Sequence, residues 1–172
     1  MGIKTLIDFY QSVEREVCLL SSIHSARLRC RYGCRDCCID ELTVFEIEAE
    51  NIQNSYPDLL RQANPHPVGA CAFLDEAGAC RIYEHRPYVC RTQGLPLRWI
   101  EKPSEERIVE KRDICLLNDR GNPVETLPDD ECWSIGPFEE ELARLQAAVH
   151  HGKLHRKSLR ELFNRTEAKG ER

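Results

Sequence analysis

The chain has 172 residues, of which 41% are hydrophobic and 31% charged, and these values are typical of a single globular domain. Its formal net charge of -5 argues against a protein built to neutralise nucleic-acid phosphates, and no apolar run is long enough to span a bilayer. Asp8, Glu14, Arg15 and Glu16 interrupt any apolar stretch that could form a secretory signal. We therefore expect a protein of the reducing cytoplasm.

Helical signals dominate the first third of the chain. Apolar residues at steps of three and four predict a helix over residues 3–28. The cysteine-rich stretch "CRYGCRDCC" follows at residues 30–38, where Gly33 allows a tight turn. Thr43 and Glu46 fit a capping box, which predicts a helix over residues 44–54.

The middle of the chain predicts shorter elements. Pro57 suits the first turn of a short helix. Residues 71–83 are expected to form a small β-hairpin around a turn at residues 75–78. Pro87 can open another helix, which places Cys90 in or near its first turn.

The last third is expected to be helical again. Residues 102–112 are highly charged and predict a solvated helix. Apolar residues predict a helix from Pro137 to Gly152, and a basic helix is expected over residues 154–164 with a solvated face.

Ten cysteines require a chemical explanation. A cytoplasmic chain of this length does not need disulfides to fold, so metal ligation is the leading hypothesis. Short gaps let successive thiolates converge on one centre, as they do in structural zinc sites and iron–sulfur clusters. The expected metal ligands are a C-x3-C-x2-C-C run, a C-x8-C-x9-C set and one later cysteine: Cys30, Cys34, Cys37, Cys38, Cys71, Cys80, Cys90 and Cys115.

The adjacent pair Cys37 and Cys38 limits how these ligands can be arranged. Neighbouring side chains diverge on a strand or a helix, so one thiolate should face a second centre, bridge two ions or close the site from another side. Eight ligands would suit two four-coordinate sites or one cluster beside a zinc, whereas seven or fewer would suit one site with spare thiols. Cys18 is expected to be a small buried side chain, and acidic neighbours make Cys132 a poor thiolate candidate.

A thiolate centre carries net negative charge and needs donors around it. Arg86 and Arg91 lie next to the C-x9-C segment, and we expect them to contact the bound cofactor. For Arg31 and Arg35 the sequence leaves two alternatives open, this role or an ordinary surface position.

The stretch at residues 30–38, followed by "CRIYEHRPYVCR", resembles a cysteine-cluster family of zinc- or iron-chelating domains, often called YkgJ-type. The matching positions are Cys30, Cys34, Cys37, Cys38, Cys71, Cys80, Ile82, Tyr83, Arg86, Pro87, Cys90 and Arg91, and "ICLLN" around Cys115 resembles a later cysteine of the family. The resemblance covers about residues 27–117. It implies a metal-binding core with flanking N- and C-terminal helices, in a single domain over residues 1–172.

The resemblance also implies a more distant comparison. A related domain occurs in flagellin lysine methylases, where an iron–sulfur cluster accompanies S-adenosylmethionine-dependent methyl transfer to protein lysines. This chain is short for such an enzyme and has no clear glycine-rich turn between a strand and a helix. The resemblance therefore implies a metal site in this chain, and we do not infer the methylase activity from it.

We expect a mainly α fold, with helices around a Cys-ligated metal centre and one short β-hairpin. The expected function is a cytoplasmic metal-binding protein that holds a [4Fe–4S] cluster, which we favour, or zinc. Its partner is the metal ion or cluster; we expect no nucleic acid and no membrane, and a protein partner stays open.

Two alternatives remain. The first is an iron–sulfur-dependent enzyme that modifies protein, or a small oxidoreductase, with Tyr83, His85 and Asp36 as acid–base candidates. The second is a thiol-redox or metal-handling protein that uses the C-x-x-C pair Cys34 and Cys37.

Overall fold

The computed structural model describes residues 5–104 and 107–163. The α-helices are α1 (Leu6–Ile23), α2 (Glu46–Ser55), α3 (Pro57–Gln62), α4 (Tyr88–Thr92) and α5 (Ile135–Val149). The strands are β1 (Thr43–Phe45), β2 (Leu97–Ser104), β3 (Arg107–Asp113), β4 (Trp133–Ser134) and β5 (Arg156–Ser158). Short 3-10 helices complete the list: η1 (Tyr83–His85), η2 (Val124–Thr126), η3 (Asp129–Glu131) and η4 (Arg160–Phe163).

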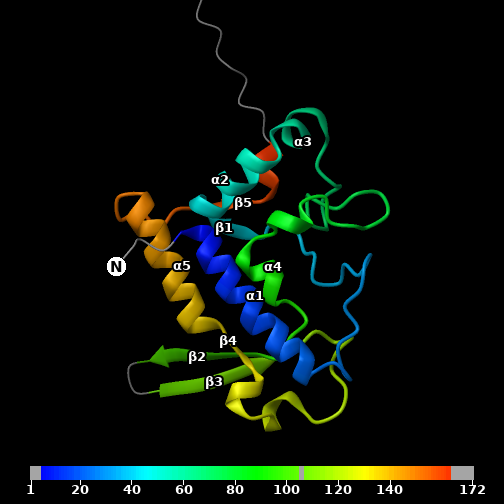
Figure 1. Ribbon diagram of the computed structural model, residues 1–172, viewed down its shortest axis with the longest axis vertical. Helices are drawn as coiled ribbons and strands as arrows, with labels where there is room; N and C mark the ends of the chain where they lie inside the picture. Colours follow the sequence, from blue (N-terminus) through cyan, green and yellow to red (C-terminus); the bar gives the residue numbers. More distant parts are fainter. Residues whose placement is uncertain (1–4, 105–106, 164–172) are drawn as a thin grey trace, which may run out of the picture.

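The elements are arranged around α1 and α5, which lie side by side (Figure 1). At one end is a three-stranded sheet of order β3-β2-β4, in which β2 pairs antiparallel with β3 and parallel with β4. At the other end α2 and α3 lie beside a two-stranded antiparallel sheet of β1 and β5. None of the described helices is both long enough and apolar enough to cross a membrane.

The expectation of a mainly α fold around a metal centre is wrong. Helices hold 43% of the structure and strands 16%, in two small sheets. Of the helix expected over residues 102–112, residues 102–104 belong to β2 and residues 107–112 to β3, while residues 105 and 106 lie outside the described residues. The segment expected to be helical over residues 154–164 instead forms β5 and η4, and Asn164 lies outside the described residues. Charged side chains on both ribbon faces left no apolar periodicity, and backbone pairing decided the structure.

The helix-start signals were partly correct. Thr5 and Asp8 form a capping box that starts α1 at Leu6, and the helix ends at Ile23 rather than at residue 28. Residues 3 and 4 of the expected helix lie outside the described residues. Pro57 opens α3, as predicted. The capping box predicted at Thr43 is absent, because Thr43–Phe45 pairs with β5 as a strand and α2 begins after it without a side-chain cap.

Three hydrophobic clusters form the core of the described structure, and the smallest consists of Ile114, Val124, Leu127 and Cys132. The two larger clusters flank the cysteine segments. The upper cluster joins α2, α3, η4 and the segment just after residue 70: Val44, Ala49, Ile52, Leu60, Cys71, Ala72, Phe73, Leu74, Ile82, Leu159, Leu162 and Phe163. The aromatic cluster joins α1, α4, α5 and β4: Phe9, Tyr10, Val13, Leu20, Phe45, Tyr88, Leu95, Trp133, Leu142 and Leu145. The segments that carry the predicted ligands connect these two clusters.

Candidate metal centre

The predicted ligands lie mostly on irregular chain rather than on helices. Residues 24–42 connect α1 to β1 along the side of the molecule away from α5, and the segment that follows α3 lies on the same side (Figure 1). All ten cysteines are free thiols in the described structure. Among the described residues, no group of three or more His, Cys, Asp or Glu side chains is arranged to hold a metal ion, which also corrects the expected centre.

Two backbone turns shape the C-x3-C-x2-C-C run. The amide of Cys34 donates to the carbonyl of Arg31 at 2.9 Å, and the amide of Cys38 donates to that of Arg35 at 2.8 Å. Gly33 has a φ of 80°, a left-handed conformation that glycine adopts without strain. The run is therefore a pair of consecutive tight turns with four thiols on it.

Cys38 connects this run to the segment that carries Cys71 and Cys80. The amide of Cys71 donates to the carbonyl of Cys38 at 2.9 Å, and all three cysteines pack against the upper cluster. Leu74 and Cys80 form an antiparallel bridge around the turn predicted at residues 75–78, so the expected hairpin is a tight loop with one bridge.

Cys90 lies in the first turn of α4, as the sequence predicted, and it is half-buried. Burial raises the pKa of its thiol, and the negative charges of Cys71, Cys80 and Cys37 raise it further. The pKa of Cys90 therefore depends on the charges of three other cysteines. Thiolates there would repel one another unless a cation lay between them.

Cys30 has a different set of neighbours. Asn118 is fully buried; its Nδ2 donates to the Gly94 carbonyl at 2.8 Å and lies 3.4 Å from Cys30 Sγ. The Asn118 backbone amide donates to the carbonyl of Cys115 at 2.7 Å. Burial raises the pKa of Cys30, the Asn118 hydrogen bond lowers it, and the charges of Cys34, Cys115 and Cys37 raise it. Asn118 therefore holds Cys30 and the Cys115 turn together.

The adjacent thiols Cys37 and Cys38 interact with each other. A hydrogen bond from Cys38 lowers the pKa of Cys37 to about 7. The same hydrogen bond, followed by burial, raises the pKa of Cys38. Cys37 is exposed whereas Cys38 packs against the upper cluster, so the two side chains lie in different environments.

The two arginines expected near the cofactor face α1. The Arg91 guanidinium donates to Glu14 Oε1 at 2.6 Å and to the carbonyl of Arg86 at 2.9 Å, and it stacks 4.1 Å from the centre of the Tyr10 ring. Arg86 contacts Glu14 at 3.5 Å, and its charge lowers the pKa of Cys80. Arg31 and Arg35 are exposed. Of these four, Arg86 therefore has an electrostatic effect on a predicted ligand.

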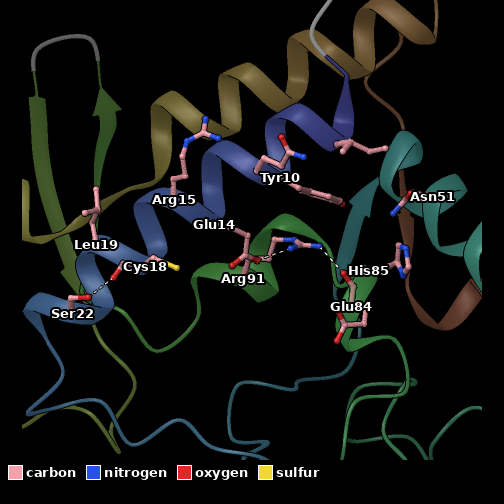
Figure 2. A pocket seen from close by; sticks show the side chains of 12 residues that line it. Tyr10, Glu14, Arg15, Cys18, Leu19, Ser22, Asn51, Glu84, His85 and Arg91 are labelled. Atoms are coloured by element: carbon pink, nitrogen blue, oxygen red, sulfur yellow. Dashed lines mark hydrogen bonds and ion pairs between the residues drawn. The ribbon is translucent and has the colours of Figure 1, made fainter.

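A pocket of about 920 Å³ lies along α1, opposite Asn51 of α2, His85 of η1 and Arg91 of α4. Figure 2 shows the Glu14–Arg91 ion pair on its wall, with His85 and Cys18 on either side. Cys18 is exposed there, so the expectation that it is buried is wrong, because α1 packs through its other face. Of the acid–base candidates, His85 lines this cavity and its Nδ1 lies 3.0 Å from Tyr56 Oη, while Tyr83 and Asp36 are exposed.

The residues that support the cysteines carry almost no signal in the sequence. Asn118 lies in a turn-rich stretch where asparagine is common, and Gly94 follows a helix end, where glycine is common. For Glu14 the sequence indicates only a charge that interrupts an apolar run. Only the proximity of Asn118 to Cys115 in the sequence could have indicated its role.

The donor set fits a thiolate-bound metal. Burial raises the pKa of Cys71, Cys80 and Cys90, and the charges of other thiols raise the pKa of Cys71 and Cys90 further. A bound cation would offset both effects. A family model named CxxCxxCC and described as "Putative zinc- or iron-chelating domain" matches residues 29–116. Of the ten cysteines, Cys18 and Cys132 lie outside this match and the other eight lie within it. No curated protein and no solved structure matches the chain significantly.

Proposed function

The chain belongs to the CxxCxxCC family of zinc- or iron-chelating domains, and on that premise we propose that its eight matched cysteines bind zinc or an iron–sulfur cluster. The protein is then a metal-binding protein of a reducing compartment such as the cytoplasm, where its thiols stay available as ligands. The family name has two residues between its first two cysteines, and this chain has three, between Cys30 and Cys34.

One observation supports this proposal most. Cysteines from segments that are distant in the sequence lie close together: Cys38, Cys71 and Cys80 meet at the upper cluster. Asn118 connects the sulfur of Cys30 to the backbone turn that begins at Cys115. The backbone amide of Cys71 donates a hydrogen bond of 2.9 Å to the carbonyl of Cys38, which joins two of these segments directly. Small shifts of the irregular segments would then close the thiols on a metal, which adds its binding energy to folding.

The chain's own residues have distinct tasks in this proposal. The thiolates supply the ligands, and Arg86 with Arg81 offsets the negative charge at Cys80. Asn118 directs its amide toward the sulfur of Cys30. Such outer contacts fix the orientation of a ligand and set its basicity.

The test is the metal content of the full chain, purified without oxygen and without added metal, together with its visible spectrum. Iron and sulfide with a broad absorbance near about 400 nm would establish a cluster, and a colourless protein with zinc would establish zinc. Cys38→Ser should lower the metal content, whereas Cys18→Ser, outside the matched segment, should leave it unchanged. Metal-free protein, or equal metal in both variants, would refute the proposal.

The cavity beside α1 supports a second candidate function, a metal-dependent enzyme. It is large enough for a small substrate and lies against α4, whose Arg91 follows Cys90 directly. If the methylase resemblance extends to activity, the metal-loaded chain should bind S-adenosylmethionine in a calorimetric titration. An absence of heat at saturating ligand would remove this candidate and leave the metal-binding proposal unaffected.

A further inference from the structure

We propose that the outer edge of β3 is a self-association surface, to which a second copy of this chain adds its own β3 in antiparallel pairing. The pairing aligns Arg107 of each copy with Glu110 of the other, and Ile108 of each copy with Val109 of the other. This inference goes beyond the proposed metal binding and does not depend on it, because β3 carries no cysteine.

The outer edge of β3 is open. β3 is the terminal strand of the sheet of order β3-β2-β4, and the ribbon lies near the lower edge of the molecule in Figure 1. No backbone–backbone hydrogen bond joins residues 107–113 to a turn or loop of the described chain. The N–H and C=O groups along this edge are therefore available as a template for another strand.

The strand itself contains nothing that blocks such pairing. Proteins commonly protect an open edge with a proline or a β-bulge. In this ribbon both features belong to β2, which contains Pro103 and an irregular register between Glu101 and Ser104. Arg107–Asp113 contains no proline and no glycine. The outer strand thus has only its charged side chains to decide what it pairs with.

The far end of β3 is already occupied, which limits where a second strand can bind. Arg112 Nη1 donates to the carbonyls of Val124 and Leu127, and η2 packs against this end of the strand. Residues 107–111 remain for a second copy. The proposed pairing is centred within this stretch, and it keeps the Asp113 residues of the two copies about 30 Å apart. The rest of the two molecules therefore stays clear of the interface.

The charges of β3 select the register. With the centre between Ile108 and Val109, an arginine lies opposite a glutamate at both ends of the pairing, and opposite charges across strands attract. A shift by one residue would place Arg107 opposite Lys111 and Ile108 opposite Glu110, which is unfavourable at both positions. Arg107 makes no ion pair with any described residue, so its charge is available to the partner.

Exposed apolar side chains lie beside these charges. Ile100 is the cross-strand neighbour of Glu110, so Ile100, Ile108 and Glu110 share one face of the ribbon. Ile100 is 48% exposed and Ile108 is 66% exposed. In the proposed dimer, Val109 of the second copy lies opposite Ile108 and continues this apolar row across the interface. Burial of these side chains gives the association a hydrophobic driving force in addition to the charge pairing.

The test is sedimentation velocity of the full chain over a range of concentrations, in a reductant that prevents disulfides between copies. The paired stretch is short, so we expect a reversible dimer that forms as the concentration rises. Arg107→Glu should raise the dissociation constant about tenfold or more, because it removes two attractions and creates two repulsions. Lys102→Glu, the same change of charge on the inner strand β2, is the matched control and should leave the constant unchanged.

A charge exchange tests the register. Glu110→Arg alone should also weaken the dimer, because it places arginines opposite each other. An equimolar mixture of Arg107→Glu and Glu110→Arg should form a heterodimer, because every cross-strand charge pair then joins an acid to a base again. Circular dichroism checks that each variant is folded. Glu110 also bonds to Arg98 and Arg112, so the comparison of Arg107→Glu with Lys102→Glu keeps the test decisive if Glu110→Arg does not fold.

Three results would overturn the proposal. A parent chain that stays monomeric at every concentration, or a dimer that Arg107→Glu and Lys102→Glu affect equally, would exclude β3 as the interface. A mixture of folded Arg107→Glu and Glu110→Arg that stays monomeric would exclude this register. None of these results bears on the metal content of the chain, so the proposed function would survive each of them.

Discussion

Glu48 is a carboxylate enclosed between α1, α2 and α4. It is 2% exposed, and its Oε1 accepts hydrogen bonds from the Tyr10 hydroxyl at 2.9 Å and from the Tyr88 amide at 2.7 Å. Burial raises the pKa of this carboxyl group. Because Tyr88 begins α4, Glu48 helps to position the helix that carries Cys90.

Glu48→Gln should stabilise the protein relative to the parent as pH rises from 5 to 8. A carboxyl pKa raised by folding contributes stability that is full below the unfolded value and is lost as pH rises through the folded value. The difference should reach about 1.4 kcal/mol per unit by which folding raises the pKa. Urea unfolding of both proteins across this range measures it, and a pH-independent difference would contradict the assignment.

Gly94 lies so close to the sulfur of Cys30 that a side chain at this position should disturb the cysteine. Its φ is 93°, and a Cβ there would lie 2.5 Å from Cys30 Sγ. Gly94→Ala should therefore lower the unfolding free energy by about 1–2 kcal/mol from backbone strain alone and should also displace Cys30 and lower metal occupancy. Gly152→Ala is the matched control, because Gly152 has a φ of 83° and no atom within 4 Å of that Cβ. Equal metal occupancy in the two variants would exclude a role for the Gly94–Cys30 contact.

At the scale of single residues, the sequence predicted the candidate ligands but not the buried polar residues around them. The spacing of the cysteines indicated ligands because ligand spacing is a local property. Burial of Glu48 and Asn118 depends on packing between distant elements, and a single sequence carries no signal for it. The candidate ligands could thus be predicted from the sequence, whereas the residues that pack around them could not.

At the scale of elements, the signals that succeeded were short-range. Pro57 opens α3, and a helical apolar pattern located α5 to within a few residues. The sequence did not predict the strands, for two reasons. β1 and β5 pair over a long separation in the sequence, from Thr43 to Ser158. The side chains of β2 and β3 are mostly exposed and charged, so these strands show no apolar pattern. Pairing partners decide such strands, and local composition does not.

The irregular segment between α1 and β1 is the part of the chain that metal binding should order most. Its only regular features near the cysteines are two turns, so metal binding should order it more than any other part. Hydrogen exchange should slow in residues 29–42 when Zn²⁺ is added. The β2–β3 ribbon, which carries no cysteine, serves as the internal control. Equal slowing in both segments, or none, would count against ligation by this segment.

At the scale of the whole molecule, the cysteine segments connect the upper cluster to the aromatic cluster. Cys71 belongs to the upper cluster, whereas Tyr88, two residues before Cys90, belongs to the aromatic cluster. A metal bound between these segments would therefore tie both halves of the core together. Metal removal should then weaken the fold as a whole rather than a single loop.

The central claim is that cysteine thiolates hold the metal, and X-ray absorption at the edge of the co-purified metal tests it most directly. The account predicts a first shell of sulfur alone, at about 2.3 Å if the metal is zinc. A first shell dominated by nitrogen or oxygen would contradict it.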